Sequence, residues 1–254
     1  MQTSATPRGP GLAGREIVIT RPAGTARALV RRVRALGGTP VLLPGLALRG
    51  PTDTAAARAG LREALGGELV IFTSPAAVDH AVRLTPLHTL ATVLAVGQGT
   101  AIALRRHGVR EPLVPSRQDS EGLLDHPVLR DVRGRRVALV GAPGGRGLLR
   151  HQLAVRGAHL LEVQVYRRVT PRLDQRHAAA VLRLSPLARV LLSSDEALQN
   201  VCRLLPSAAL AHLLTITAVA SSARLAESAR RAGFGRVALA ASALAEDLLA
   251  AAAR

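Results

Sequence analysis

The chain of 254 residues repeats itself at an offset of 120 residues, and this repeat limits the folds that it can adopt. The matching segments are 14–20 with 134–140, 29–38 with 148–158, 70–84 with 190–204, and 94–108 with 217–233. In the third pair, Ser74 aligns with Ser194. Four matches in the same order favour an internal duplication over chance similarity among apolar segments.

Each half alternates short apolar runs with amphipathic segments. Ile17–Thr20 and Val137–Val140 each follow Gly-Arg and are typical of buried parallel strands. Apolar residues at helical spacing follow the first of these runs, at Ala26, Leu29 and Val33. Further strands are expected at 70–72, 93–96, 190–192 and 215–219. The alternation predicts an α/β fold of two parallel-sheet domains with helices on both faces of each sheet.

The extended segments 43–49 and 161–169 lie near corresponding points of the repeat and are expected to be linker strands. The chain would then leave one domain and later return to it. We expect residues 1–13, rich in Gly, Pro, Ser and Thr, to form a disordered tail. The expected domains are a discontinuous one of residues 14–42 plus 170–254 and an inserted one of residues 50–160.

The net charge is +17, because the chain has 34 basic residues, all of them Arg, and only 17 acidic residues. This excess of positive charge indicates affinity for polyanions. Nucleic acid, anionic lipid and polycarboxylate substrates all fit this charge. Only 1% of the residues are aromatic, which argues against single-strand binding by base stacking. No DNA-reading motif is evident, so we expect no specific nucleic-acid partner.

The sequence gives no sign of membrane insertion or disulfide bonding. The uncharged stretches Leu84–Leu104 and Leu204–Ala223 are interrupted by Pro, His and Thr, and buried strands with loops fit them better than spanning helices. The single Cys202 permits no internal disulfide and fits a reducing cytoplasm.

Candidate ligand-binding loops follow the expected strands, where parallel α/β proteins bind their ligands. They are 20–24, 73–75, 97–100, 141–147, 193–195 and 220–223. Gly, Ser and Thr dominate these loops, and their N–H and hydroxyl groups suit carboxylate or phosphate oxygens. Each Ser or Thr has an alternative interpretation as a simple helix N-cap.

Other catalytic motifs are weak or missing. The eight His residues lack metal-ligand spacing, so no metal site is expected. GAPGGRG at 141–147 lacks the ending of a phosphate-binding loop. Cys202 falls on an apolar helix face and is interpreted as a core residue. Tyr166 is the only tyrosine, placed in a linker segment beside Arg167 and Arg168, and is either structural or a proton donor facing a cleft.

The ordered set of motifs resembles the uroporphyrinogen-III synthase family over roughly residues 14–250. The segments that carry the resemblance are TRP (20–22), FTSPAAV (72–78), AVGQGTAIALRRHGV (95–109), PSRQDSEGLL (115–124), and Tyr-Arg-Arg (166–168). The last of these follows Gly-Ala (157–158) and an extended run. The resemblance implies two α/β domains joined by a two-stranded ladder, an active site in the cleft between them, and no metal or organic cofactor.

The resemblance also implies an activity and a set of site residues. A family member is a cytoplasmic lyase that closes linear hydroxymethylbilane to uroporphyrinogen III, with inversion of ring D and loss of water. Tyr166 would be the catalytic acid, and the substrate's eight carboxylates would enter a basic, hydroxyl-lined cleft. The implied substrate-binding residues are Arg21, Ser74, Gly97, Thr100 and Ser194.

Two departures from the family pattern concern this site. Ala76 stands where the family often has Asn, and the segment Ala220–Ala223 replaces a usual Gly-x-x-Thr. A hydroxyl of Ser221 or Ser222 is expected to substitute there. The alternatives are a non-catalytic tetrapyrrole-binding or regulatory paralogue and, suggested only by the charge, a nucleic-acid-associated protein. By family likeness we expect a monomer, with hinge closure around the substrate.

Overall fold

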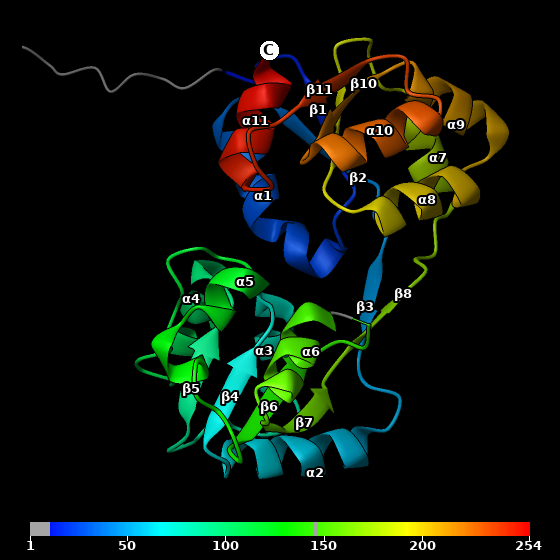
Figure 1. Cartoon of the computed structure of the whole chain (residues 1–254). Helices are drawn as coiled ribbons and strands as arrows, with labels where there is room; N and C mark the ends of the chain where they lie inside the picture. Colours follow the sequence, from blue (N-terminus) through cyan, green and yellow to red (C-terminus); the bar gives the residue numbers. More distant parts are fainter. Residues whose placement is uncertain (1–10, 145–146) are drawn as a thin grey trace, which may run out of the picture. The chain divides into compact units, whose positions relative to one another are not determined.

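The computed structural model describes residues 11–144 and 147–254, and the chain divides into two compact units. Unit 1 combines the segment up to Ala47 with Val169–Arg254, and unit 2 is Leu48–Arg168. The division falls within β3 (Ala47–Arg49) and β8 (Arg167–Val169). These two strands pair with each other in a two-stranded sheet and lie side by side (Figure 1).

The described part of unit 2 contains a parallel sheet with the strand order β5-β4-β6-β7. Its strands are β4 (Leu69–Phe72), β5 (Thr92–Ala95), β6 (Arg136–Gly141) and β7 (His159–Gln164). Its helices are α2 (Thr54–Leu65), α3 (Pro75–Ala81), α4 (Gln98–Arg106), α5 (Ser120–Leu124), the 3-10 helix η1 (Pro127–Leu129) and α6 (Gly147–Val155). Val70 and Phe72 pack with α2, α3 and α4, whereas Leu69 and Ile71 pack with α5 and α6. Since side chains alternate along a strand, helices cover both faces of this sheet.

The described part of unit 1 contains a parallel sheet with the strand order β11-β10-β9-β1-β2. Its strands are β1 (Glu16–Ile19), β2 (Thr39–Leu42), β9 (Arg189–Leu192), β10 (Thr217–Ala220) and β11 (Val237–Leu239). Its helices are α1 (Ala23–Ala35), α7 (Gln175–Leu182), α8 (Asp195–Leu204), α9 (Ser207–Leu214), α10 (Ala223–Arg231) and α11 (Ala245–Ala253). Val18 and Val190 pack with α7 to α10, and Ile17 and Ile19 pack with α1 and α11. The predicted α/β fold with two parallel sheets is confirmed.

The repeat does not coincide with the units. In unit 2, Leu69 of β4 pairs with Val137 of β6. The residues 120 positions away from these two, Arg189 of β9 and Ile17 of β1, pair with each other in unit 1. The first repeat therefore supplies β1 and β2 to one sheet and β4 and β5 to the other, and the second repeat completes both. Each sheet needs strands from both repeats, which is why unit 1 is discontinuous in sequence.

The structure differs from the expected boundaries at two places. Residues 1–10 lie outside the described residues, but Leu12 has no exposed surface and packs in the unit 1 core, so the expected tail does not extend to residue 13. The expected linker 161–169 is shorter. Residues up to Gln164 belong to β7, which hydrogen bonds to β6, and only β8 pairs with β3.

We predict that a unit folds alone and that a repeat does not. A fragment of residues 48–168 contains a complete sheet and both of its helical layers, whereas a fragment of residues 14–133 contains only β1 and β2 of one sheet and β4 and β5 of the other. Urea unfolding followed by circular dichroism should show a cooperative transition for the first fragment and none for the second. A cooperative transition of fragment 14–133 would contradict the division.

Candidate functional site

In unit 2, three predicted site residues lie at the carboxyl ends of strands in the same parallel sheet. Ser74 follows β4, Gly97 follows β5, and Tyr166 follows β7. Because parallel strands end at the same edge of their sheet, the fold brings together loops that are far apart in sequence. This edge is where parallel α/β proteins bind ligands.

Tyr166 contacts Ser74 through its hydroxyl group. The phenol oxygen Oη lies 3.2 Å from Ser74 Oγ, and either hydroxyl can be the donor. Ser74 is also the N-cap of α3, where its Oγ accepts a hydrogen bond from the N–H of Ala77 at 3.1 Å. Tyr166 is only 9% exposed and belongs to the unit 2 core. A buried ring with a fixed hydroxyl suits positioned proton transfer.

The Tyr166 ring also stacks on His80, a contact that the sequence reasoning missed. The ring centroids are 5.2 Å apart and the planes differ by 22°. Burial lowers the pKa of the His80 imidazole; Arg83 acts in the same direction, and Asp79 opposes it. Sequence reasoning considered His80 only as a metal ligand. One available signal was its alignment with Asn200 in the repeat, which marks the position as polar in both halves.

The loop before α4 is held by a residue that the sequence reasoning did not single out. Gln118 Oε1 accepts a hydrogen bond from the N–H of Gln98 at 2.9 Å. A Cβ at Gly97 would lie 2.8 Å from that same oxygen, so a larger residue there would displace the Gln118 side chain. Thr100 is 4% exposed in the first turn of α4, and its side chain is therefore largely packed against the protein.

In unit 1, the strand ends carry hydroxyl groups that also cap helices. Ser194 follows β9 and caps α8, accepting a hydrogen bond from Ala197 N–H at 3.3 Å. Ser222 follows β10 and caps α10 in the same way through Leu225 N–H. Ser221 is half-buried, and its N–H donates to the carbonyl of Leu192. The N-cap interpretation is therefore correct for Ser194 and Ser222, and each hydroxyl still has its own proton to donate.

Arg21 places a positive charge at the unit 1 edge. It is half-buried just after β1, and its Nη2 donates to the carbonyl oxygen of Ala243 at 3.1 Å. Burial lowers the pKa of its guanidinium, which nevertheless stays charged. Across residues 11–144 and 147–254, no carboxylate lies within 4.0 Å of Arg21. Its charge is therefore available to an anion.

Two other features of the described residues offer no competing chemistry. No group of three or more His, Cys, Asp or Glu residues among them could hold a metal ion. Cys202 packs against the unit 1 core, and burial raises the pKa of its thiol, which makes it a poor nucleophile at neutral pH.

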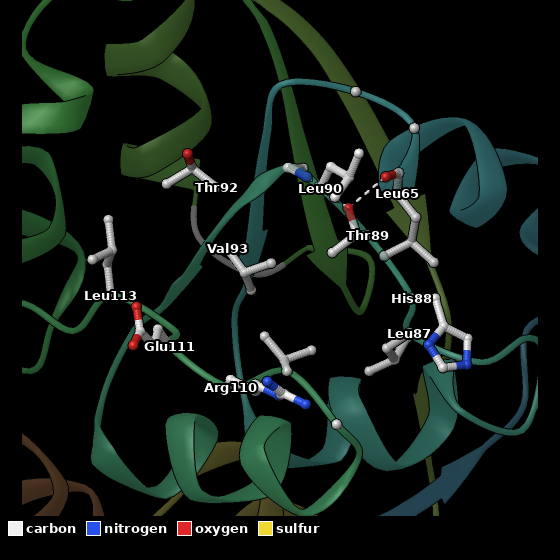
Figure 2. Close-up of a pocket in the computed structure, with 15 residues that line it drawn as sticks. Leu65, Leu87, His88, Thr89, Leu90, Thr92, Val93, Arg110, Glu111 and Leu113 are labelled. Atoms are coloured by element: carbon white, nitrogen blue, oxygen red, sulfur yellow. Dashed lines mark hydrogen bonds between the residues drawn. The ribbon is translucent and has the colours of Figure 1, made fainter.

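Two cavities in unit 2 are poor matches for a polyanionic ligand. A cavity of about 350 Å³ is lined by Tyr166 and Arg167 but also by the carboxylates of Asp53 and Glu162, which repel anions. A second cavity, of about 870 Å³, lies at the amino-terminal end of β5, where it is lined by Thr92 and Val93 (Figure 2). It is thus at the other end of the strand from Gly97.

The fold and these residues define a class: two-unit parallel α/β proteins with hydroxyl and guanidinium groups at the strand ends. A protein-family model described as uroporphyrinogen-III synthase HemD matches residues 27–250. The uroporphyrinogen-III synthase of Escherichia coli strain K12 is 31% identical over 229 residues, covering 86% of this chain and 92% of that protein. The chain therefore belongs to the uroporphyrinogen-III synthase family.

Solved structures support the fold. A mutant uroporphyrinogen III synthase from the extremely thermophilic bacterium Thermus thermophilus has a TM-score of 0.57 at 22% identity, covering 93% of this chain and 96% of that one. The uroporphyrinogen-III synthetase from Helicobacter pylori 26695 has a TM-score of 0.60 at 15% identity, covering 92% and 96%. No helix of the described residues is long and apolar enough to span a membrane.

We predict that Ser74→Ala destabilises the protein more than Ser222→Ala. Both variants lose an N-cap, which costs about 1 kcal/mol, but Ser74→Ala also loses the hydrogen bond to Tyr166, worth about 1 kcal/mol more. The measurement is the free energy of unfolding in urea. Equal losses for the two variants would show that the contact with Tyr166 contributes nothing to stability.

Proposed function

We propose that this chain closes hydroxymethylbilane to uroporphyrinogen III, with Tyr166 as the proton donor. The observation that carries this proposal is the buried phenol whose hydroxyl is fixed against Ser74 at a ligand-binding strand edge, in a chain of the synthase family. The enzyme is a lyase, because the reaction removes water from the substrate. Phenols are protonated at neutral pH and can therefore act as donors.

Tyr166 acts on the substrate's hydroxymethyl group. Its O–H protonates the leaving hydroxyl, the carbon–oxygen bond breaks, and water leaves behind an azafulvenium cation. Ser74 can donate its O–H to the phenolate that forms, since the two oxygens are 3.2 Å apart. Ring closure through a spiro intermediate inverts ring D and releases one proton, which restores the phenol. The balance is loss of one water molecule.

The remaining candidate residues are proposed to bind carboxylates. In unit 1, Arg21 supplies a charge without a carboxylate partner, and Ser194, Ser221 and Ser222 supply hydroxyl groups. In unit 2, Gly97 and Thr100 lie in the loop and first turn of α4. Since the substrate closes without the enzyme to the unflipped isomer, binding contributes mainly by controlling conformation and proximity.

We further propose that the protein works as a monomer in the cytoplasm, with no metal, organic cofactor or specific nucleic-acid partner. The excess of Arg, on this proposal, attracts the polycarboxylate substrate. The rival function is a non-catalytic tetrapyrrole-binding paralogue, which the departures at Ala76 and Ala220–Ala223 favour. Tight product binding without turnover would select this rival.

Tyr166→Phe should lower kcat for the type III product by about 10²-fold or more, because it removes only the proton donor. The assay separates type I from type III uroporphyrinogen after oxidation to the porphyrins. An unchanged rate of type III formation by a folded variant would remove Tyr166 from the mechanism.

Arg21→Met should raise KM roughly tenfold while leaving kcat nearly unchanged, since it removes a charged hydrogen-bond donor but keeps much of the length of the side chain. Arg27→Met is the matched control, because Arg27 is exposed on α1 of the same unit. Equal effects of the two substitutions on KM would indicate that only the net charge of the protein matters, and that Arg21 makes no direct contact with the substrate.

A further inference from the structure

Helix α3 contacts Tyr166 at two points, and the proposed function uses only one of them. Ser74, at the N-cap, contacts the phenol hydroxyl, and His80, near the other end of α3, stacks on the phenol ring. All three residues belong to unit 2, so this cluster is complete within one compact unit.

We propose that His80 is a positioning residue for Tyr166: its imidazole holds the phenol ring so that the hydroxyl stays on Ser74. The proposal rests on the proposed function of Tyr166 as proton donor. His80 does not transfer a proton itself in this account. Its effect on the reaction passes through the orientation of the ring.

The geometry fits such a role. A centroid separation of 5.2 Å with a tilt of 22° is a stacked contact within the range that aromatic pairs favour. The Tyr166 hydroxyl lies on the Cβ–Cγ axis of its side chain, so rotation about Cα–Cβ is the motion that would carry it away from Ser74. An imidazole packed against the face of the ring opposes that motion. Proton transfer is sensitive to placement because small displacements of the reacting atoms cost rate.

Burial and a neighbouring positive charge favour the neutral form of the stacking partner. Burial lowers the pKa of His80, and the nearby Arg83 lowers it further. Asp79 is the charged group that opposes this shift, and the phenol of Tyr166 is the group that faces the imidazole ring. A neutral imidazole gives the phenol no adjacent full charge, whereas an imidazolium would favour the deprotonated form of a neighbouring acid.

The internal repeat supports a role for the side chain at position 80 in contacting a neighbouring segment. His80 of α3 aligns with Asn200 of α8, and Asn200 Nδ2 donates to the carbonyl of Gly45 at 2.9 Å. Gly45 follows β2 and precedes β3, just as Tyr166 follows β7 and precedes β8. In both units the side chain at this helix position therefore contacts the segment that leads to the linker strand, β3 or β8. Only in unit 2 does that segment carry a phenol, and only in unit 2 is the side chain that contacts the segment an aromatic ring.

The spectroscopic test uses the absence of Trp, which makes tyrosine emission of the full chain a signal of Tyr166 alone. Titration from pH 8 to pH 4.5 should change this emission with a midpoint below the ordinary histidine value of about 6.5. His80→Phe should abolish the change. His88→Phe, at an exposed position of the same unit, should retain it. Persistence of the transition in His80→Phe would overturn the proposal.

The kinetic test separates positioning from binding. His80→Ala should lower kcat for type III formation about fivefold with KM within about twofold of the parent value, and His80→Phe should restore most of the loss. The His80→Phe variant keeps the test valid if His80→Ala fails to fold. Unchanged kcat in His80→Ala, or a rise in KM alone, would overturn the inference.

Tyr166→Phe, measured beside these variants, distinguishes the two proposals. If Tyr166→Phe is slow and His80→Ala is not, the positioning role fails while the proton-donor role stands. If Tyr166→Phe turns over at the parent rate, the proton-donor role fails. The positioning role in catalysis falls with it, whatever the emission titration shows.

Discussion

Strand pairing between the two repeats is the interaction on which the rest of the structure depends. β1 pairs with β9 in unit 1, and β4 pairs with β6 in unit 2; both pairs join strands from different repeats in parallel. These central pairs put the carboxyl ends of all sheet strands in a unit at one edge. The loops that carry the candidate site residues are thereby assembled from distant parts of the sequence.

Duplication gave the two units similar parallel sheets but different side chains at equivalent positions. Ser74 and Ser194 are both N-caps that follow a central strand. The position of Tyr166, however, corresponds to Leu46, which is buried and has no proton to donate. The unit 2 edge therefore has a phenol that the unit 1 edge lacks. This asymmetry is consistent with the proposed roles, proton donation at the unit 2 edge and carboxylate binding at the unit 1 edge.

The sequence predicted the parts of the fold that local patterns determine. Apolar runs located β1, β4, β6 and β9 because buried parallel strands leave a continuous apolar signal. The edge strand β7 was partly assigned to a linker, because its mixture of exposed and buried residues resembles an isolated extended segment. Leu12 was missed because a single leucine among Gly and Pro residues carries no periodic signal.

The candidate site was predictable residue by residue but not as a set of contacts. Serines after strands are recognisable as caps, and a lone tyrosine stands out by composition. The contacts of Tyr166 with Ser74 and His80 are tertiary contacts, and no local pattern encodes them. Likewise, the amide of Gln118 lies on the α4 loop only because the chain returns there after α4.

The central claim is that Ser74 and Tyr166 act as one unit in proton transfer, and a double-mutant cycle on kcat/KM for type III product tests it most directly. Residues in contact that share one function show non-additive losses. The account predicts that the double variant Ser74→Ala/Tyr166→Phe is no slower than Tyr166→Phe alone. Fully additive losses would show that the two hydroxyl groups act independently and would contradict the account.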